Sequence, residues 1–353
     1  MVNKKGFELH FHWILVLIAG AVILFFFFSL VQKQRALSSE KLSISLSTDF
    51  EAVFSSAVES RGTSQLLTIP KGGVAFSCSD VCDCNFWIGR KATQFKDKII
   101  FAPDFLSAGK AFAWSLDWKL PFRAANFLFL MSPSDKYFLV MDSSDSKSWN
   151  LFRRLNSSLP VDVSLNIISL SDIPSIVPLE DVKYRFVFLD IAYGSPFGLS
   201  DEFNDKDVSV VYVDSAEKAV TFYQKEKRSL NFIADTSLYS GDSCIFASVF
   251  AHDKDMFECG LKKGFARLAV VAEILKARAD LIESEMVFKN RPDCVYSAPN
   301  VDYLRDIVNN ARDLSLSSSF VEDRDKFIAL SNAVDGLNVL NENLVQQSCP
   351  GIF

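Results

Sequence analysis

The stretch Asp142-Ser143-Ser144-Asp145-Ser146 gathers carboxylate and hydroxyl groups within five residues. It follows an apolar run, residues 137–141, that predicts a β-strand, and it opens a predicted helix over residues 146–159. A carboxylate and two hydroxyl groups are ligands that suit a hard cation such as Mg²⁺. Mg²⁺ is therefore the one cofactor that the sequence suggests.

Three further predicted strands also end in an aspartate, namely Asp190, Asp214 and Asp235. Ligands of parallel α/β sheets bind beyond the carboxyl ends of the strands, so the four strand-end aspartates are candidate binding residues. The structural alternative is that these aspartates form turns and helix N-caps, as aspartate often does, with Asp145 capping the following helix. We favour this structural alternative.

All seven cysteines lie outside the apolar N-terminal run, which favours an oxidising compartment and disulfide bonds. Cys78, Cys82 and Cys84 form a C-x3-C-x-C cluster that could be a disulfide knot, half of a zinc site or a set of free thiols. Zinc would need a fourth donor, and His252 is the only histidine after residue 12. Disulfide bonding is therefore the favoured interpretation of the cluster.

Helix directions predict the remaining cysteine pairs. Three helices joined by loops run up, down and up, so Cys294 after the first helix and Cys349 after the third lie at the same end. We predict a Cys294–Cys349 disulfide and a second, local pair between Cys244 and Cys259. The unpaired thiol would then belong to the three-cysteine cluster.

The sequence argues against an enzyme. It contains no G-x-S-x-G, H-E-x-x-H, P-loop or G-x-G-x-x-G motif, and His252 is the only candidate base of a histidine-based triad after the N-terminal segment. Residues 1–35 carry a charge of +3 and the whole chain −6, so the remainder carries −9. An acidic body of this kind predicts no binding to nucleic acid.

Residues 13–31 are nineteen amino acids without a charge, apolar on every side, and they predict a membrane-spanning helix. A cleaved signal peptide is the alternative, but no small-x-small cleavage site follows the run. The lipid bilayer is therefore a predicted partner. We expect a single-pass protein of the cell membrane, with a short cytoplasmic N-terminus and an extracytoplasmic body.

The rest of the chain predicts an α/β fold: a small parallel-sheet α/β ectodomain with a short-strand insert, followed by a C-terminal antiparallel helical bundle. Strands are expected at 74–76, 98–102, 137–141, 163–170, 186–189, 208–213 and 230–234, and helices at 146–159 and 216–228. Heptad seams run from Leu261 to Met286 and from Phe327 to Leu344.

The predicted domains are an anchor at 1–35, a membrane-proximal helix at 36–62, a short-strand cysteine-containing region at 63–130, an α/β domain at 131–240 and a bundle at 241–353.

The D-x-S-x-S stretch after a predicted strand resembles the metal-dependent adhesion site of von Willebrand A domains. The resemblance implies Asp142, Ser144 and Ser146 as ligands and places Asp190 roughly where that family supplies its second aspartate. The part of such a domain that carries the threonine ligand is nearly absent between residues 171 and 183. The resemblance implies a divalent-cation-dependent adhesion module.

The N-terminus, with Lys4 and Lys5 before Gly6, Phe7 and a hydrophobic helix, resembles the processing site of type IV prepilins. That family is cut after the glycine and continues into a long amphipathic helix. Its glutamate is the fifth residue after the cut, whereas Glu8 here is the second. This resemblance implies a large pilin-like subunit.

Four segments, FELHFHWILVLIAG, CDCNFWIG, DKIIFAP and WSLDWKLPF, are similar to an uncharacterised group of single-span membrane proteins from archaea with small genomes. This resemblance implies an archaeal membrane setting and no known activity. We therefore expect a non-enzymatic, membrane-tethered protein that binds or scaffolds other envelope proteins, with the adhesion module and the pilin-like subunit as alternatives.

Overall fold

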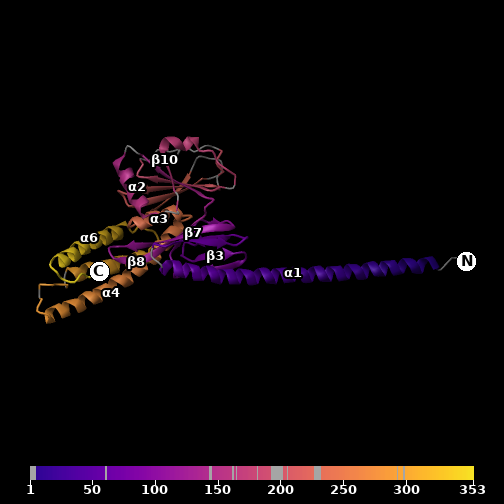
Figure 1. The fold of residues 1–353 in the computed structure, drawn as a ribbon, viewed down its shortest axis with the longest axis horizontal. Coiled ribbons are helices and arrows are strands. Elements are labelled where there is room, and N and C mark those ends of the chain that lie inside the picture. Colours follow the sequence, from indigo (N-terminus) through magenta and orange to yellow (C-terminus); the bar gives the residue numbers. More distant parts are fainter. Residues whose placement is uncertain are drawn as a thin grey trace.

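One continuous N-terminal helix, α1 (Lys5–Glu59), runs from the apolar segment into the body of the protein (Figure 1). Its segment Trp13–Gln34 is long and apolar enough to span a membrane, and none of it is buried. Its later turns bury Phe50 and Phe54 in the core of the body. The predicted anchor and membrane-proximal helix are thus one helix. This computed structural model describes residues 5–59, 62–142, 145–160, 163, 165–180, 182–191, 202–204, 206–225, 232–291, 293–296 and 299–353.

The C-terminal end of α1 packs against two four-stranded sheets. The first has the order β1-β7-β8-β5, and the second has the order β4-β3-β2-β6. Phe54 lies edge-on to Phe86 of the second sheet, with ring centroids 5.6 Å apart. Aromatic rings bury large apolar areas, so this contact fixes the helix to the body. The strands are β1 (Ser64–Ile69), β2 (Val74–Cys78), β3 (Cys84–Ile88), β4 (Lys91–Gln94), β5 (Ile100–Phe101), β6 (Phe105–Leu106), β7 (Gly109–Lys119) and β8 (Arg123–Met131).

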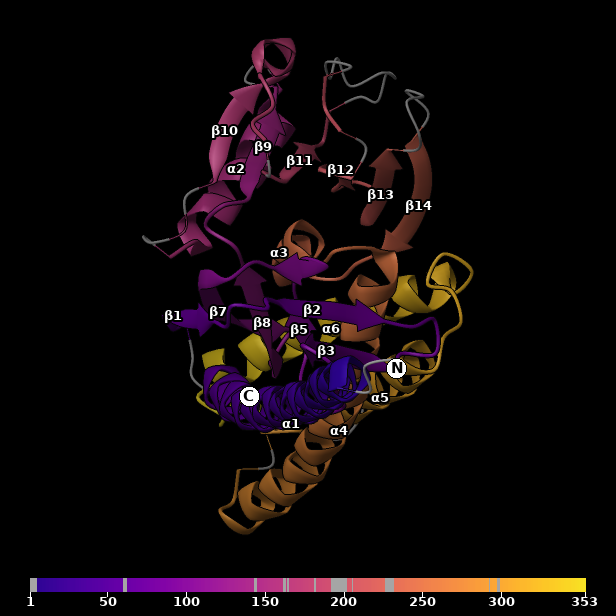
Figure 2. The ribbon, with the colours of Figure 1, turned by 90° about the vertical axis from the view of Figure 1, so that its right-hand side faces the viewer.

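A six-stranded sheet stands beside these two layers in the order β10-β9-β11-β12-β13-β14 (Figure 2). Four neighbouring strands are parallel: β9 (Lys136–Met141), β10 (Asn166–Ser169), β11 (Tyr184–Leu189) and β12 (Val208–Asp214). The near-continuous apolar sequences of β9, β11 and β12 bury both faces of the sheet, as the sequence predicted, whereas the edge strand β10 has only exposed and half-buried residues. Helix α2 (Ser146–Ser158) connects β9 to β10, and the 3₁₀ turn η1 (Leu170–Ser175) follows β10.

The predicted helix over residues 216–228 is wrong for residues 216–225, and residues 226–228 lie outside the described residues. Residues Ala219–Lys225 form β13, which pairs antiparallel with both β12 and β14 (Phe232–Leu238). The run Val220-Thr221-Phe222-Tyr223 consists of β-branched and aromatic residues, which fit a strand packed on both sides. The turn before it places Lys218 at φ +53°, a conformation that does not continue a helix.

The last third is helical, as predicted. Its helices are α3 (Asp242–Phe250), α4 (Lys254–Phe288), α5 (Asn300–Ser315) and α6 (Arg324–Gln346), and α5 packs against both α4 and α6. The predicted seam of α4 is buried from Leu261 to Met286, apart from the half-buried Ile282. The first turns of α4 also press into the sheets: a Cβ at Gly260 would lie 2.4 Å from the ring of Phe101. The bundle and the two small sheets therefore share one hydrophobic core.

Three disulfides cross-link this body. Cys294 and Cys349 are joined across a sequence separation of 55 with Cα atoms 5.7 Å apart, in agreement with the prediction. The cluster pairs Cys78 with Cys84, and it pairs Cys82 with Cys259 of α4. The cluster's cysteines are therefore not available as zinc ligands.

The predicted Cys244–Cys259 pair is wrong. Cys244 is a buried free thiol in α3, and its Sγ donates to the Ser240 carbonyl at 3.0 Å. Cys259 lies on the side of α4 that meets the second sheet, where Cys82 is its partner. Cys244 and Cys259 are only 15 residues apart in sequence, but they lie in different helices, and Cys259 contacts the second sheet whereas Cys244 contacts the Ser240 carbonyl.

Candidate functional site

The strand order brings two of the predicted metal ligands to adjacent strand ends. Asp142 follows β9 and Asp190 follows β11, and these two strands are neighbours. The chain goes from β9 outward to β10 and then back to β11 on the other side, so the order reverses between them. Such a reversal is the usual ligand position in parallel α/β sheets. Ser146 is the exposed first residue of α2, whereas Ser144 lies outside the described residues.

Hydrogen bonds give most of the strand-end aspartates structural roles. Asp190 Oδ1 accepts from the backbone N–H of Ser215 and Oδ2 accepts from the Ser215 hydroxyl, both at 2.6 Å. Asp145 caps α2 by accepting from the Lys147 N–H at 3.0 Å. Asp214 accepts from two N–H groups of the turn that follows it. These contacts match the turn and capping interpretation.

Asp235 belongs to β14, where it is paired in register with Phe222 and forms an ion pair with Lys254 at 3.0 Å. It therefore lies away from the carboxyl ends of the parallel strands. Only Asp142, Asp190 and Asp214 share that edge of the sheet, so the four aspartates do not converge on one point.

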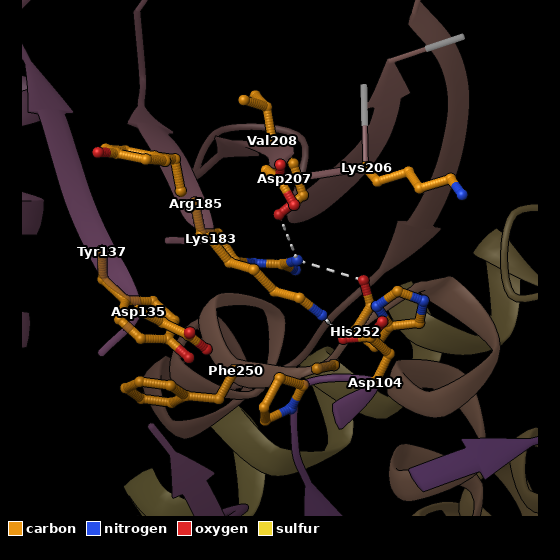
Figure 3. A pocket seen from close by; sticks show the side chains of 14 residues that line it. Asp104, Asp135, Tyr137, Lys183, Arg185, Lys206, Asp207, Val208, Phe250 and His252 are labelled. Carbon is orange, nitrogen blue, oxygen red and sulfur yellow. Dashed lines mark hydrogen bonds and ion pairs between the residues drawn. The ribbon is translucent and has the colours of Figure 1, made fainter. Parts of the chain in front are cut away.

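A cavity of about 370 Å³ opens at the opposite end of the same sheet, beside the amino ends of β9, β11 and β12 (Figure 3). We call it the interlayer cavity, because loops from the smaller sheets and from the end of α3 close it from the other side. A volume of this size is typical of small-molecule sites. Its lining residues are Pro103, Asp104, Asp135, Tyr137, Lys183, Tyr184, Arg185, Lys206, Asp207, Val208, Ser209, Phe250, Ala251 and His252.

Arg185 of β11 is the most deeply buried charge of the cavity, at 8 % exposure. Its Nη2 donates to the Ser248 carbonyl at 2.8 Å, and its Nη1 donates to the His252 carbonyl at 3.2 Å and the Ser209 hydroxyl at 3.1 Å. The Ser248 carbonyl belongs to the last turn of α3, where the helix dipole favours a cation. Burial lowers the pKa of Arg185 to about 10, which still leaves it charged at neutral pH. The guanidinium therefore joins the six-stranded sheet to the end of α3.

Acidic and basic groups surround this guanidinium (Figure 3). Lys183 forms an ion pair with Asp104. Burial raises the pKa of the Asp135 carboxyl to about 6, against the opposing charge of Lys183. Burial also lowers the pKa of His252, so its imidazole is neutral at neutral pH. The cavity thus presents donors, acceptors and one carboxyl that titrates near neutrality.

Sequence reasoning missed the interlayer cavity. His252 was identified as a lone candidate base in a loop, and it does lie in the loop between α3 and α4. The other polar residues come from separate chain segments, around Asp104, Asp135 and Lys183, and no motif links them. One sequence feature could have indicated the cavity: Lys183 and Arg185 place two charges at the start of an otherwise apolar strand.

The cavity and the strand-end aspartates have to be interpreted from their own chemistry. The chain matches no protein-family model, and comparisons with curated proteins and with solved structures found no similar protein.

Proposed function

We propose that this chain is a single-pass membrane protein whose body lies outside the cytoplasm and binds or scaffolds other components of the cell envelope. The observation that carries the proposal is an uncovered apolar span, Trp13–Gln34, continuous with a body that contains three disulfides. Disulfides persist in oxidising compartments, which favours an extracytoplasmic body. The charge of −9 outside residues 1–35 favours protein or small-molecule partners over nucleic acid.

The interlayer cavity supports binding without catalysis. Charges of both signs line it, with Lys183 and Arg185 facing Asp104 and Asp135, which suits a small polar ligand. Its one lining serine, Ser209, already accepts a hydrogen bond from Arg185 and is not activated by an adjacent base. The cavity provides recognition groups, and its described lining residues include no hydroxyl that is hydrogen-bonded to a base.

Orientation can be tested by counting free thiols. Cells are quenched in acid and denatured, and the chain is labelled with a maleimide–polyethylene glycol without reductant. The disulfides predict one mass shift, from Cys244, and seven shifts after reduction. The Cys244→Ser variant should give none without reductant. Seven shifts in the unreduced wild type would place the body in a reducing compartment and contradict the proposal.

Binding can be tested by thermal shift of the full chain in detergent against a panel of charged small molecules. A ligand of the interlayer cavity should raise the melting temperature of the wild type and have a smaller effect on Lys183→Met. The ligand should be recovered unchanged after long incubation. Recovery as a product would show catalysis and would contradict the non-enzymatic assignment.

The pilin-like subunit is the second candidate, because α1 has the layout that this resemblance implies. The helix is unbroken from Lys5 to Glu59, its residues 13–34 are exposed, and Phe50 and Phe54 pack into the head. Mass spectrometry of the native N-terminus decides between the two. A chain that begins at Phe7 supports the pilin-like subunit, and an intact Met1 to Gly6 leader removes it.

A further inference from the structure

Helix α4 carries a second apolar seam on its outer face. Val270, Ile274, Ala277, Leu281, Ser284 and Phe288 follow one another at spacings of four and three residues. All six are exposed, and the four large ones are 57 %, 62 %, 71 % and 90 % exposed. We call this set the outer seam. At about 1.5 Å per residue it extends over about 27 Å of the helix.

The outer seam lies opposite the packed face of α4. The buried face contains Leu275, Ala279 and Met286, which contact the body. At 100° per residue the centres of the two faces are about 160° apart on the helix. Figures 1 and 2 show α4 extending beyond the sheets, with its end near Phe288 on the side of the body away from the N-terminus. The outer seam therefore faces solvent and not the bilayer.

A repeat of 3.5 residues identifies the kind of partner. Apolar residues at alternating three- and four-residue spacing form the contact line of two packed helices, whereas packing against a sheet needs no such repeat. Soluble surfaces rarely expose contiguous apolar patches of more than a few hundred Å² without an interaction. The occupant is therefore another helix with an apolar line of similar length, and a second α4 has that line.

Common anchoring in one bilayer favours a second copy in parallel orientation. Two chains inserted in the same direction are related by an axis normal to the membrane, and α4 extends away from the membrane-embedded end of α1 (Figure 1). Glu273, which pairs with Arg312 of its own chain at 3.5 Å, would in a parallel pair also lie beside Arg278 of the other copy, an attractive contact on both sides. Asp280 would lie beside the other copy's Glu285, whose charge Lys289 already neutralises at 2.6 Å. Tethering in a bilayer raises the local concentration, so an interface of modest size is sufficient.

We propose that the outer seam is the interface of a parallel homodimer, formed by α4 packing against α4 of a second copy in the same membrane. The proposal concerns assembly: it rests on the proposed membrane anchoring, and it does not depend on the interlayer cavity or its ligand. Val270, Ile274, Ala277 and Leu281 would lie in successive contact layers, each against its own counterpart. Phe288 would close the far end of the interface.

Cysteine cross-linking in native membranes tests the proposal. The body's six disulfide cysteines and the buried Cys244 leave an introduced thiol as the reactive one. With a short bis-maleimide, Leu281→Cys should give a cross-linked dimer. Val339→Cys, 58 % exposed on α6, is the matched control and should not. Equal cross-linking at both positions, or none at Leu281→Cys, overturns the proposal.

A charge introduced into the outer seam should dissociate the dimer into monomers without unfolding the chain. Ile274→Lys, combined with Leu281→Cys, should lower the cross-linked fraction by about tenfold or more, because a lysine would be buried in the interface. Val339→Lys, combined with Leu281→Cys, should leave it unchanged. Far-ultraviolet circular dichroism checks that both variants are folded. An unchanged cross-linked fraction with Ile274→Lys would mean that another surface, for example the apolar segment of α1, holds the dimer together, and it would refute this assignment.

Discussion

The disulfide between Cys82 and Cys259 should be the most stabilising of the three. Cys82 lies in the turn between β2 and β3 at φ +61°, and Cys259 lies in the second turn of α4. The bond therefore fastens the second small sheet to the longest helix of the body. The perturbation is the double substitution Cys82→Ser with Cys259→Ser, which removes the cross-link and leaves no odd thiol.

The sequence separations give the magnitude. A cross-link restricts the unfolded chain by an entropy that grows with the logarithm of the closed loop. A separation of 177 residues corresponds to about 5 kcal/mol at 25 °C. The Cys294–Cys349 bond, with a separation of 55, corresponds to about 4 kcal/mol, and the Cys78–Cys84 bond, with a separation of 6, to about 2 kcal/mol.

The assay is urea unfolding of the full chain in detergent, with the free energy of unfolding taken from the midpoint and slope of each transition. Each pair is replaced by serines in turn, and Cys244→Ser is the control that removes a thiol without removing a disulfide. The loss of stability should be greatest for the Cys82–Cys259 pair and smallest for Cys78–Cys84. A larger loss at Cys294–Cys349 than at Cys82–Cys259 would refute the loop-entropy reasoning.

Three further perturbations test other parts of the structure. Gly260→Ala should lower the free energy of unfolding by about 1–3 kcal/mol, since the added methyl group meets the buried ring of Phe101, and an unchanged melting temperature would contradict this packing. If Asp142 binds a divalent cation, Mg²⁺ should raise the melting temperature of the wild type and not of Asp142→Ala; no shift with Mg²⁺ or Mn²⁺ would remove the adhesion-module alternative. Asp135 has a pKa of about 6 when folded, above its unfolded value of about 3.9, so its contribution to stability falls as pH rises from 4 to 6. Urea midpoints should show Asp135→Asn to be more stable than the wild type at pH 7 by about 2 kcal/mol and equal to it at pH 4; equal midpoints at both values would contradict the burial of this carboxyl.

The sequence predicted the elements that depend on neighbouring residues along the chain. The run from Trp13 onward is apolar on every side, so it could be recognised without any knowledge of the body. Helix α2 followed from Asp145, a capping residue, before an amphipathic segment. The Cys294–Cys349 pair followed from counting helix directions, because a bundle with short loops allows few arrangements.

Tertiary contacts decided the parts that the sequence did not predict. Residues 216–228 contain many charges and were interpreted as a helix, but pairing with β12 and β14 makes Ala219–Lys225 a strand. The partner of Cys259 depends on which side of α4 meets the second sheet, which heptad spacing does not specify. The interlayer cavity combines residues as distant as Asp104 and His252, so it exists only once the sheets and α3 are packed.

If the apolar segment spans a bilayer, as proposed, the unbroken α1 makes the position of the body depend on bilayer thickness. The apolar segment Trp13–Gln34 has 22 residues and is about 33 Å long, so a hydrocarbon layer of about 30 Å requires a tilt of about 25°. From the middle of that segment to Phe54, the helix is a lever of about 45 Å, so this tilt displaces the body sideways by about 19 Å. In a layer of about 27 Å the tilt becomes about 35° and the displacement about 26 Å. A thinning of about 3 Å is thus converted into a lateral movement of the body that is more than twice as large.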